Sequence, residues 1–136
     1  MTTQLITYLN FNGNCREAMT FYQQCLGGEL FMQKISESPM AAQMPSEAGA
    51  SILHSTLTKD TIVLMGSDMM GPGLVKGNVV TLCMNCSSDE EINDYFAKLA
   101  EGGNVKMQLH QSFWGATYGE LTDKFGMNWM FNFSKN

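Results

Sequence analysis

The chain has 136 residues, of which 44% are hydrophobic and only 15% are charged, and its formal net charge is −5. This length suits one domain with a real hydrophobic core, and the scarcity of lysine and arginine argues against a nucleic-acid or anionic-membrane partner. No apolar run approaches the roughly 18 residues that span a bilayer, and the N-terminus lacks the features of a signal peptide, so we expect a cytoplasmic protein.

The first half begins with a β-rich segment, "LITYLNF" (5–11), that leads into an amphipathic helix. The helix is predicted to begin at Asn14, with Glu17 three residues later as in a capping box, and to end at Gly27-Gly28. Three further strands are expected in "ELFMQKI", "SILHSTL" and "TIVLMGS". This half therefore predicts the order βαβββ.

Two loops contain all three prolines of the chain. Residues 36–50 are interpreted as a flexible insertion that could cover a pocket. Residues 71–76 are expected to link two modules, about 1–70 and 77–136. Neither module could bury both its helix and its sheet alone, so we expect a single domain over 1–136.

The second half repeats the first. A strand in "VVTLCMN" (79–85) precedes a helix that opens in "SSDEE" and ends at Gly102-Gly103, and strands follow in "VKMQLHQ", "ATYGEL" and "NWMFNF". A shift of 74 residues superposes the apolar faces of the two helices, with Phe21 falling on Tyr95. The turn between the last two strands is expected in "DKFG".

The last strand alternates apolar and largely polar side chains. One side carries Trp129, Phe131 and Phe133, and the other carries Asn128, Met130 and Asn132. A strand with one apolar face belongs against a hydrophobic core. We therefore expect the aromatic side to pack against the helices and the other side to face a ligand site.

The four cysteines are expected to stay reduced in a cytoplasmic chain. Cys83 and Cys86 have CxxC spacing, but in an extended strand their side chains point to opposite faces, a poor geometry for chelation. Cys15 lies at a helix N-terminus, where the helix dipole would lower the pKa of its thiol. The alternative is that this turn only needs a small residue.

Few side chains suggest catalysis. His54 and His110 lie in strand segments and Glu120 lies in "YGEL"; each could act as a general acid or base, or have a purely structural role. Asp68 and Asp123 lie at turns, where a carboxylate typically accepts hydrogen bonds from backbone N–H groups.

The segment "SFWGATYGEL" places aromatic residues between glycines. Gly115 and Gly119 allow the backbone to bend close to a ligand or a partner subunit. Trp114 and Tyr118 carry rings with polar groups, which are favoured in small-molecule sites and at interfaces alike. The alternative is that both rings pack the core or a dimer interface.

The chain resembles the PhnB-like branch of the vicinal oxygen chelate superfamily, which includes glyoxalase, bleomycin resistance proteins and dihydroxybiphenyl dioxygenase. The resemblance covers nearly the whole chain and rests on the tandem modules and on "FNGNCREAMTFY" and "FWGATYG…D.FG..W". It implies an α+β fold in which tandem βαβββ modules form curved sheets around a cleft, with helices on the convex side, and a homodimer. PhnB-like proteins are often labelled as demethylubiquinone methyltransferases, but no strand runs into the Gly-rich turn that a nucleoside cofactor needs. We expect no cofactor.

The resemblance also locates four metal-ligand positions. Metal-using members take one ligand, usually His, Gln or Glu, from the first and from the last strand of each module. Here the first-strand positions fall on Thr7 and, through the 74-residue shift, on Thr81. The last-strand positions fall on Met130 and on Leu64 or Met65. None of these side chains suits a hard or borderline divalent ion, so we expect no metal site.

The sequence thus favours a protein that binds a small, partly apolar molecule in the cleft without metal. The expected pocket residues are Thr7, Thr81, Trp114, Tyr118, Asn128 and Met130. One alternative is a metal-independent acid–base enzyme that uses His54, His110 or Glu120. The others are a metal-dependent lyase or dioxygenase of the glyoxalase type and a dimeric protein without a small ligand.

Overall fold

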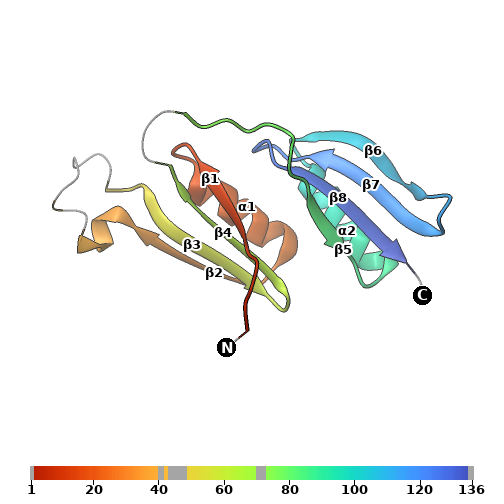
Figure 1. The fold of residues 1–136 in the computed structure, drawn as a ribbon, viewed down its shortest axis with the longest axis horizontal. Helices are drawn as coiled ribbons and strands as arrows, with labels where there is room; N and C mark the ends of the chain where they lie inside the picture. The colour runs from red at the N-terminus through yellow and green to blue at the C-terminus, as the bar shows by residue number, and fades with distance from the viewer. Residues whose placement is uncertain (1, 40–41, 43–48, 70–72, 135–136) are drawn as a thin grey trace. The chain divides into compact units, whose positions relative to one another are not determined.

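The computed structural model describes residues 2–39, 42, 49–69 and 73–134 (Figure 1). It contains two compact units, Met1–Leu74 and Val75–Asn136. Each unit holds one α-helix and one four-stranded sheet, so the α+β fold of two βαβββ modules is confirmed.

Parts of two predicted loops fall outside the described residues. These are 40–41 and 43–48 of the insertion and 71–72 of the linker. Within the described chain, neither α-helix combines the length and the apolarity that crossing a membrane requires.

The described residues of the first unit form six elements in chain order. They are β1 (Thr7–Phe11), α1 (Cys15–Leu26), β2 (Glu29–Lys34), the short 3-10 helix η1 (Ile35–Glu37), β3 (Ile52–Lys59) and β4 (Ile62–Asp68). The sheet order is β1-β4-β3-β2, with β1 parallel to β4 and the other neighbours antiparallel. Helix α1 packs on β2, β3 and β4 (Figure 1).

The core of the first unit lies between α1 and one face of this sheet. Leu9 and Phe11 of β1 are buried on that face, as are Ala18 and Met19 of the helix. Gly66 of β4 permits the close approach, because a Cβ there would lie 3.1 Å from both the Leu9 carbonyl oxygen and the Phe11 ring. Each buried large apolar side chain contributes about 1.5–3 kcal/mol relative to an exposed one.

The N-terminus of α1 differs from the predicted capping box. Asn14 precedes the helix, but its side chain forms no capping hydrogen bond. Instead the carboxylate of Asp68, at the end of β4, accepts a hydrogen bond from the Cys15 backbone N–H through Oδ1 at 2.9 Å. Its Oδ2 accepts from the Ile52 N–H at 2.8 Å. A residue distant in sequence thus satisfies the first turn and ties α1 to two strands.

The second unit repeats this architecture. Its elements are β5 (Leu82–Asn85), α2 (Asp89–Ala100), β6 (Asn104–Gln111), β7 (Ala116–Thr122) and β8 (Asn128–Ser134). The sheet order is β5-β8-β7-β6, with β5 parallel to β8. Helix α2 packs on β6, β7 and β8.

The aromatic side of β8 packs as predicted. Trp129 and Phe131 are buried, and the Phe131 ring meets the Phe96 ring of α2 edge-on at 5.3 Å. A Cβ on Gly119 of β7 would lie 2.9 Å from the Phe96 ring, so this glycine allows the helix to approach the sheet. Phe133, near the strand end, is only half-buried.

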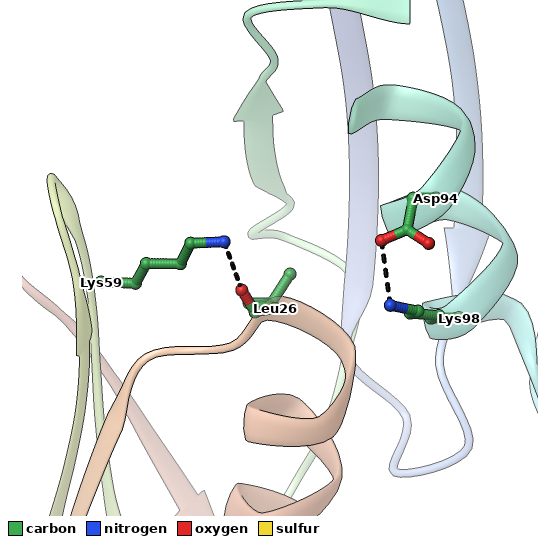
Figure 2. A network of polar contacts seen from close by, with 4 residues as sticks. All are labelled: Leu26, Lys59, Asp94 and Lys98. Atoms are coloured by element: carbon green, nitrogen blue, oxygen red, sulfur yellow. Dashed lines mark hydrogen bonds and ion pairs between the residues drawn. The ribbon is translucent and has the colours of Figure 1, made fainter. Parts of the chain in front are cut away.

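Side-chain contacts stabilise the ends and surfaces of the helices. Ser88 caps α2 by accepting a hydrogen bond from the Glu91 N–H at 3.1 Å. Figure 2 shows an exposed Lys98–Asp94 ion pair on α2, with 3.0 Å between Nζ and Oδ2. It also shows the Lys59 ammonium donating to the Leu26 carbonyl oxygen at 2.8 Å, at the C-terminus of α1. A cation is favoured there because the last helical carbonyls lack intrahelical partners.

Candidate ligand-binding site

Each sheet has one face that its own helix covers and a second face that this helix leaves uncovered, here called the open face. On β8, Met130 and Asn132 are half-exposed on the open face, whereas Trp129 and Phe131 are buried on the other. Strand pairing places further residues beside them. The open face of the second sheet carries Cys83, Asn85, Tyr118, Glu120, Thr122, Asn128, Met130 and Asn132.

Three hydrogen bonds connect polar side chains on this open face. Tyr118 Oη donates to Glu120 Oε2 at 3.0 Å. Asn132 Nδ2 donates to Asn85 Oδ1 at 2.9 Å. At the opposite end of β8, the Thr122 hydroxyl donates to Asn128 Oδ1 at 2.8 Å. These contacts fix the directions of polar groups that remain accessible.

Aromatic rings border the same face near the β6–β7 turn. The Trp114 and Tyr118 ring centroids are 5.5 Å apart, and the His110 and Tyr118 centroids are 6.4 Å apart. Trp114 is 53% exposed, so within its own unit it is not a core residue. Gly115 has a φ of +86°, a backbone conformation that glycine adopts without strain, and it follows Trp114 in the turn.

The phenol of Tyr118 is electrostatically perturbed. Burial, followed by the Glu120 carboxylate that accepts its hydrogen bond, raises the pKa of Tyr118 from 10.0 to about 12. Both causes favour the protonated phenol. Tyr118 is therefore a hydrogen-bond donor throughout the physiological pH range.

We predict that Tyr118 ionises near pH 12 in the folded protein. Because the folded-state pKa lies above the unfolded-state value, this group stabilises the fold below about pH 10 and loses that contribution as the pH rises toward 12. Ultraviolet absorbance of the phenolate measures the ionisation. Tyr118→Phe should remove the absorbance of one phenolate from this part of the titration curve, and Glu120→Gln should move the ionisation of Tyr118 to lower pH. A titration curve near pH 12 that Tyr118→Phe leaves unchanged would contradict the assignment.

The first sheet has its own open face, which carries Tyr8, His54, Thr56 and Met65. The Tyr8 and His54 rings stack with centroids 6.1 Å apart. His54 Nε2 lies 3.1 Å from the Thr56 hydroxyl oxygen. The contacts with Tyr8 and Thr56 therefore give the half-buried His54 a structural role.

In the first strands, the predicted metal-ligand positions Thr7 and Thr81 lie one and two residues before Tyr8 and Cys83, which are on the open faces. Met65 pairs with Tyr8, and Met130 pairs with Cys83. Thr7 instead lies on the strand face of Leu9 and Phe11, which are buried, and pairs with Leu64. Thr81 is exposed and immediately precedes β5.

A change of register between the modules accounts for the larger displacement of Thr81, because the 74-residue shift keeps the one-residue offset of Thr7 and adds another. The helices are related by 74 residues, from Cys15 to Asp89, as the sequence indicated. The first strands are related by 75, from Tyr8 to Cys83. Side chains alternate along a strand, so an offset of one residue selects the opposite face.

The residues at these four positions do not fit the superfamily's metal. They supply the phenol of Tyr8, the thiol of Cys83 and the thioethers of Met65 and Met130. A thiolate can bind Zn²⁺, but phenol and thioether groups are poor ligands for hard or borderline divalent ions, and the set contains no imidazole or carboxylate. Among the described residues, no group of three or more His, Cys, Asp or Glu side chains could hold a metal ion.

The three candidate catalytic residues lie in different units, His54 in the first and His110 and Glu120 in the second. The second sheet brings Glu120 and Tyr118 together, with His110 paired to Tyr118 across the strands. His110 Nδ1 lies 2.9 Å from the Gln108 carbonyl oxygen. Since a carbonyl only accepts, Nδ1 carries the proton in this contact, which leaves Nε2 as the acceptor of a neutral ring. His54 belongs to the first unit.

The cysteines divide by exposure. Cys15 is buried, with its sulfur 3.6 Å from the Ser55 hydroxyl oxygen, and burial raises the pKa of its thiol to about 11. The expectation of a lowered pKa is therefore wrong, because desolvation outweighs the helix dipole. Burial also raises the pKa of Cys86 to about 12. Cys83 is exposed on the open face. The sequence offers a signal for this, because Cys83 is next to the apolar Met84 and adjacent residues of a strand point to opposite faces.

Comparisons with known proteins match nearly the whole chain. Residues 3–131 match the family described as 3-demethylubiquinone-9 3-methyltransferase. Protein YjdN of Escherichia coli strain K12 is 36% identical, over 96% of this chain and 95% of that protein. The crystal structure of PA1353 from Pseudomonas aeruginosa is 38% identical with a TM-score of 0.84, and the alignment covers 99% of this chain and all of that one.

More distant structures share the fold. A Bacillus cereus PhnB protein, described as a putative 3-demethylubiquinone-9 3-methyltransferase, is 24% identical with a TM-score of 0.77, over 97% of this chain and all of that one. Glyoxalase-related and fosfomycin resistance proteins have TM-scores of 0.59 to 0.63 at 12 to 15% identity. At that identity the likeness concerns the fold alone.

Proposed function

The chain belongs to the PhnB-like family described as 3-demethylubiquinone-9 3-methyltransferase, and from this premise we propose that it binds a small, partly apolar molecule on the open faces of its sheets, without the metal of the wider superfamily. The open face of the second sheet carries the proposal. There the hydrogen-bonded Tyr118–Glu120 and Asn85–Asn132 pairs flank Met130.

This combination of groups suits ligand binding. Ligand sites are mostly apolar surfaces with a few oriented polar groups. Met130 supplies an adaptable apolar contact, Trp114 supplies an accessible ring, and the amides of Asn85 and Asn132 supply donors and acceptors. Mutual hydrogen bonds hold several of these groups in place, so less conformational entropy is lost when a ligand binds.

The proposal departs from the methyl transfer in the family's description. The turn after β1 contains a single glycine, Gly13, and the turn after β5 contains none. Neither turn has the Gly-rich form that cradles a nucleoside cofactor. Binding is therefore the activity that we assign to this chain.

A second candidate is acid–base catalysis without metal. The observation that favours it is the Tyr118–Glu120 hydrogen bond beside His110, since a hydrogen-bonded carboxylate can transfer a proton to or from a bound molecule. This candidate requires turnover that Glu120→Gln abolishes. Binding alone predicts saturation with the ligand recovered unchanged.

We predict that a fragment library containing neutral, cationic and anionic compounds yields ligands that quench tryptophan fluorescence. The chain has two tryptophans, and only Trp114 is accessible, whereas Trp129 is 3% exposed. Met130→Ala should weaken binding by roughly fivefold, because it removes about 1 kcal/mol of apolar contact. Met130→Leu, which conserves the apolar volume, is the matched control and should bind nearly as well as the wild type.

Two outcomes would contradict the proposal. One is the absence of saturable binding by any compound class. The other is stoichiometric Zn, Ni, Mn or Fe by elemental analysis after incubation with these ions, which would restore the metal-dependent alternative.

A further inference from the structure

We propose that the open face of the second sheet selects an organic cation: a protonated amine or quaternary ammonium attached to an aromatic or apolar body. The inference rests on the proposed function and specifies the chemical class of its ligand. It follows from the charges and aromatic rings around Glu120.

Glu120 is a half-exposed carboxylate at the centre of this face. In the β7–β8 ladder it pairs with Met130, and in the β6–β7 ladder it pairs with Met107. Its Oε2 accepts the hydrogen bond from Tyr118, and within the described part of the chain Oε1 has no hydrogen-bond donor. One carboxylate oxygen is therefore available to a ligand that brings its own donor or positive charge.

The surrounding strands contain almost no positive charge. Strands β5, β7 and β8 contain no lysine or arginine. The one lysine of β6, Lys106, lies at the irregularity between Val105 and Met107 and forms no ion pair with Glu120. The net charge of the chain is −5. A cation thus gains the attraction of Glu120, whereas an anion meets a carboxylate that no lysine or arginine of β5, β7 or β8 neutralises.

Aromatic and sulfur groups complete the recognition of a cation. Trp114 is 5.5 Å from Tyr118 between ring centroids, and Tyr118 is hydrogen-bonded to Glu120. The faces of indole and phenol rings attract ammonium groups. The thioether of Met130 accommodates the apolar substituents of such a ligand. The carboxylate, the rings and the thioether are the combination by which proteins bind amines.

The test uses three probes built on one ring: benzylammonium, neutral benzyl alcohol and anionic benzoate. Titrations followed by NMR should shift the Trp114 indole and the Asn85 and Asn132 side-chain amide resonances. We expect benzylammonium to bind roughly tenfold more tightly than benzyl alcohol, with benzoate weakest. Higher ionic strength should reduce the advantage of the cation.

Glu120→Gln should remove most of the advantage of benzylammonium over benzyl alcohol, because the glutamine retains an acceptor for Tyr118 but loses the charge, and only the attraction of the rings remains. The matched control is Glu101→Gln, which makes the same change of net charge at the exposed end of α2 and should leave the preference intact. Equal affinity for the cation and the alcohol, or no benzylammonium binding, would overturn the inference. Neutral library ligands that still bind would preserve the proposed function.

Discussion

Asp123→Ala is expected to lower the free energy of unfolding by about 3–5 kcal/mol. The Asp123 carboxylate is 3% exposed and accepts three hydrogen bonds within six residues of sequence. Its Oδ1 accepts from the backbone N–H groups of Phe125 at 2.8 Å and Met127 at 3.1 Å, and its Oδ2 accepts from Trp129 Nε1 at 2.9 Å. Alanine would leave these donors without the acceptor, and each unsatisfied buried group costs about 1–3 kcal/mol.

Urea denaturation followed by Trp129 fluorescence measures this loss directly, because the indole is one of the donors. Asp123→Asn should have an intermediate effect, since the amide oxygen can still accept a backbone hydrogen bond while the NH₂ group opposes the indole N–H. The control is Asp94→Ala, which removes an exposed ion pair and should cost less than about 1 kcal/mol. Equal losses in Asp123→Ala and Asp94→Ala would show that the buried carboxylate is not structural.

The expected turn role of the two aspartates is confirmed in one case and extended in the other. Asp123 organises its own turn, as the "DKFG" pattern indicated. Asp68 bonds N–H groups 53 and 16 residues away in sequence. Local sequence identifies a carboxylate at a strand end, but only the tertiary fold determines which donors reach it.

The helices and strands could be predicted from the sequence because the patterns that identify them lie within short segments. Apolar spacing identified the buried side of each helix, and alternation identified the buried side of β8, where Trp129 and Phe131 pack on α2. These patterns report burial at each position. They therefore predict which side of an element meets the core.

The open-face residues were harder to predict from the sequence because their positions depend on the register between elements. Counting back from the first helix selects Thr7 in place of Tyr8, and the 74-residue shift then selects Thr81 in place of Cys83, because the first strands are related by 75 residues. Cys83 has CxxC spacing in the sequence, but in the structure it pairs with Met130 on the open face. The apolar residues Leu9 and Met84 are buried and mark the core side of each first strand. The residues next to them in sequence, Tyr8 and Cys83, therefore point to the open faces.

Gly103 follows the second helix at a point where the backbone passes close to a strand end. A Cβ added at Gly103 would lie 2.3 Å from the Thr122 carbonyl oxygen and 3.0 Å from the Asp123 backbone. Gly28 occupies the corresponding place in the first unit, where a Cβ would lie 2.5 Å from the Thr58 carbonyl oxygen. Both modules thus require glycine for the close approach of two backbone segments, which no side-chain rotation can relieve.

Gly103→Ala is therefore expected to destabilise the second unit by about 3 kcal/mol or more, the upper range for overpacking. The control is Gly115→Ala, where φ is +86° but no atom lies within 4 Å of the new Cβ, so only backbone strain of about 1–2 kcal/mol applies. Urea denaturation followed by circular dichroism and Trp129 fluorescence compares the two variants. We expect Gly103→Ala to be less stable than Gly115→Ala because of the close backbone contact. Backbone strain alone would predict the opposite order, since Gly115 has a positive φ and Gly103 does not. The reverse order would mean that this backbone can move away from Thr122 at little cost.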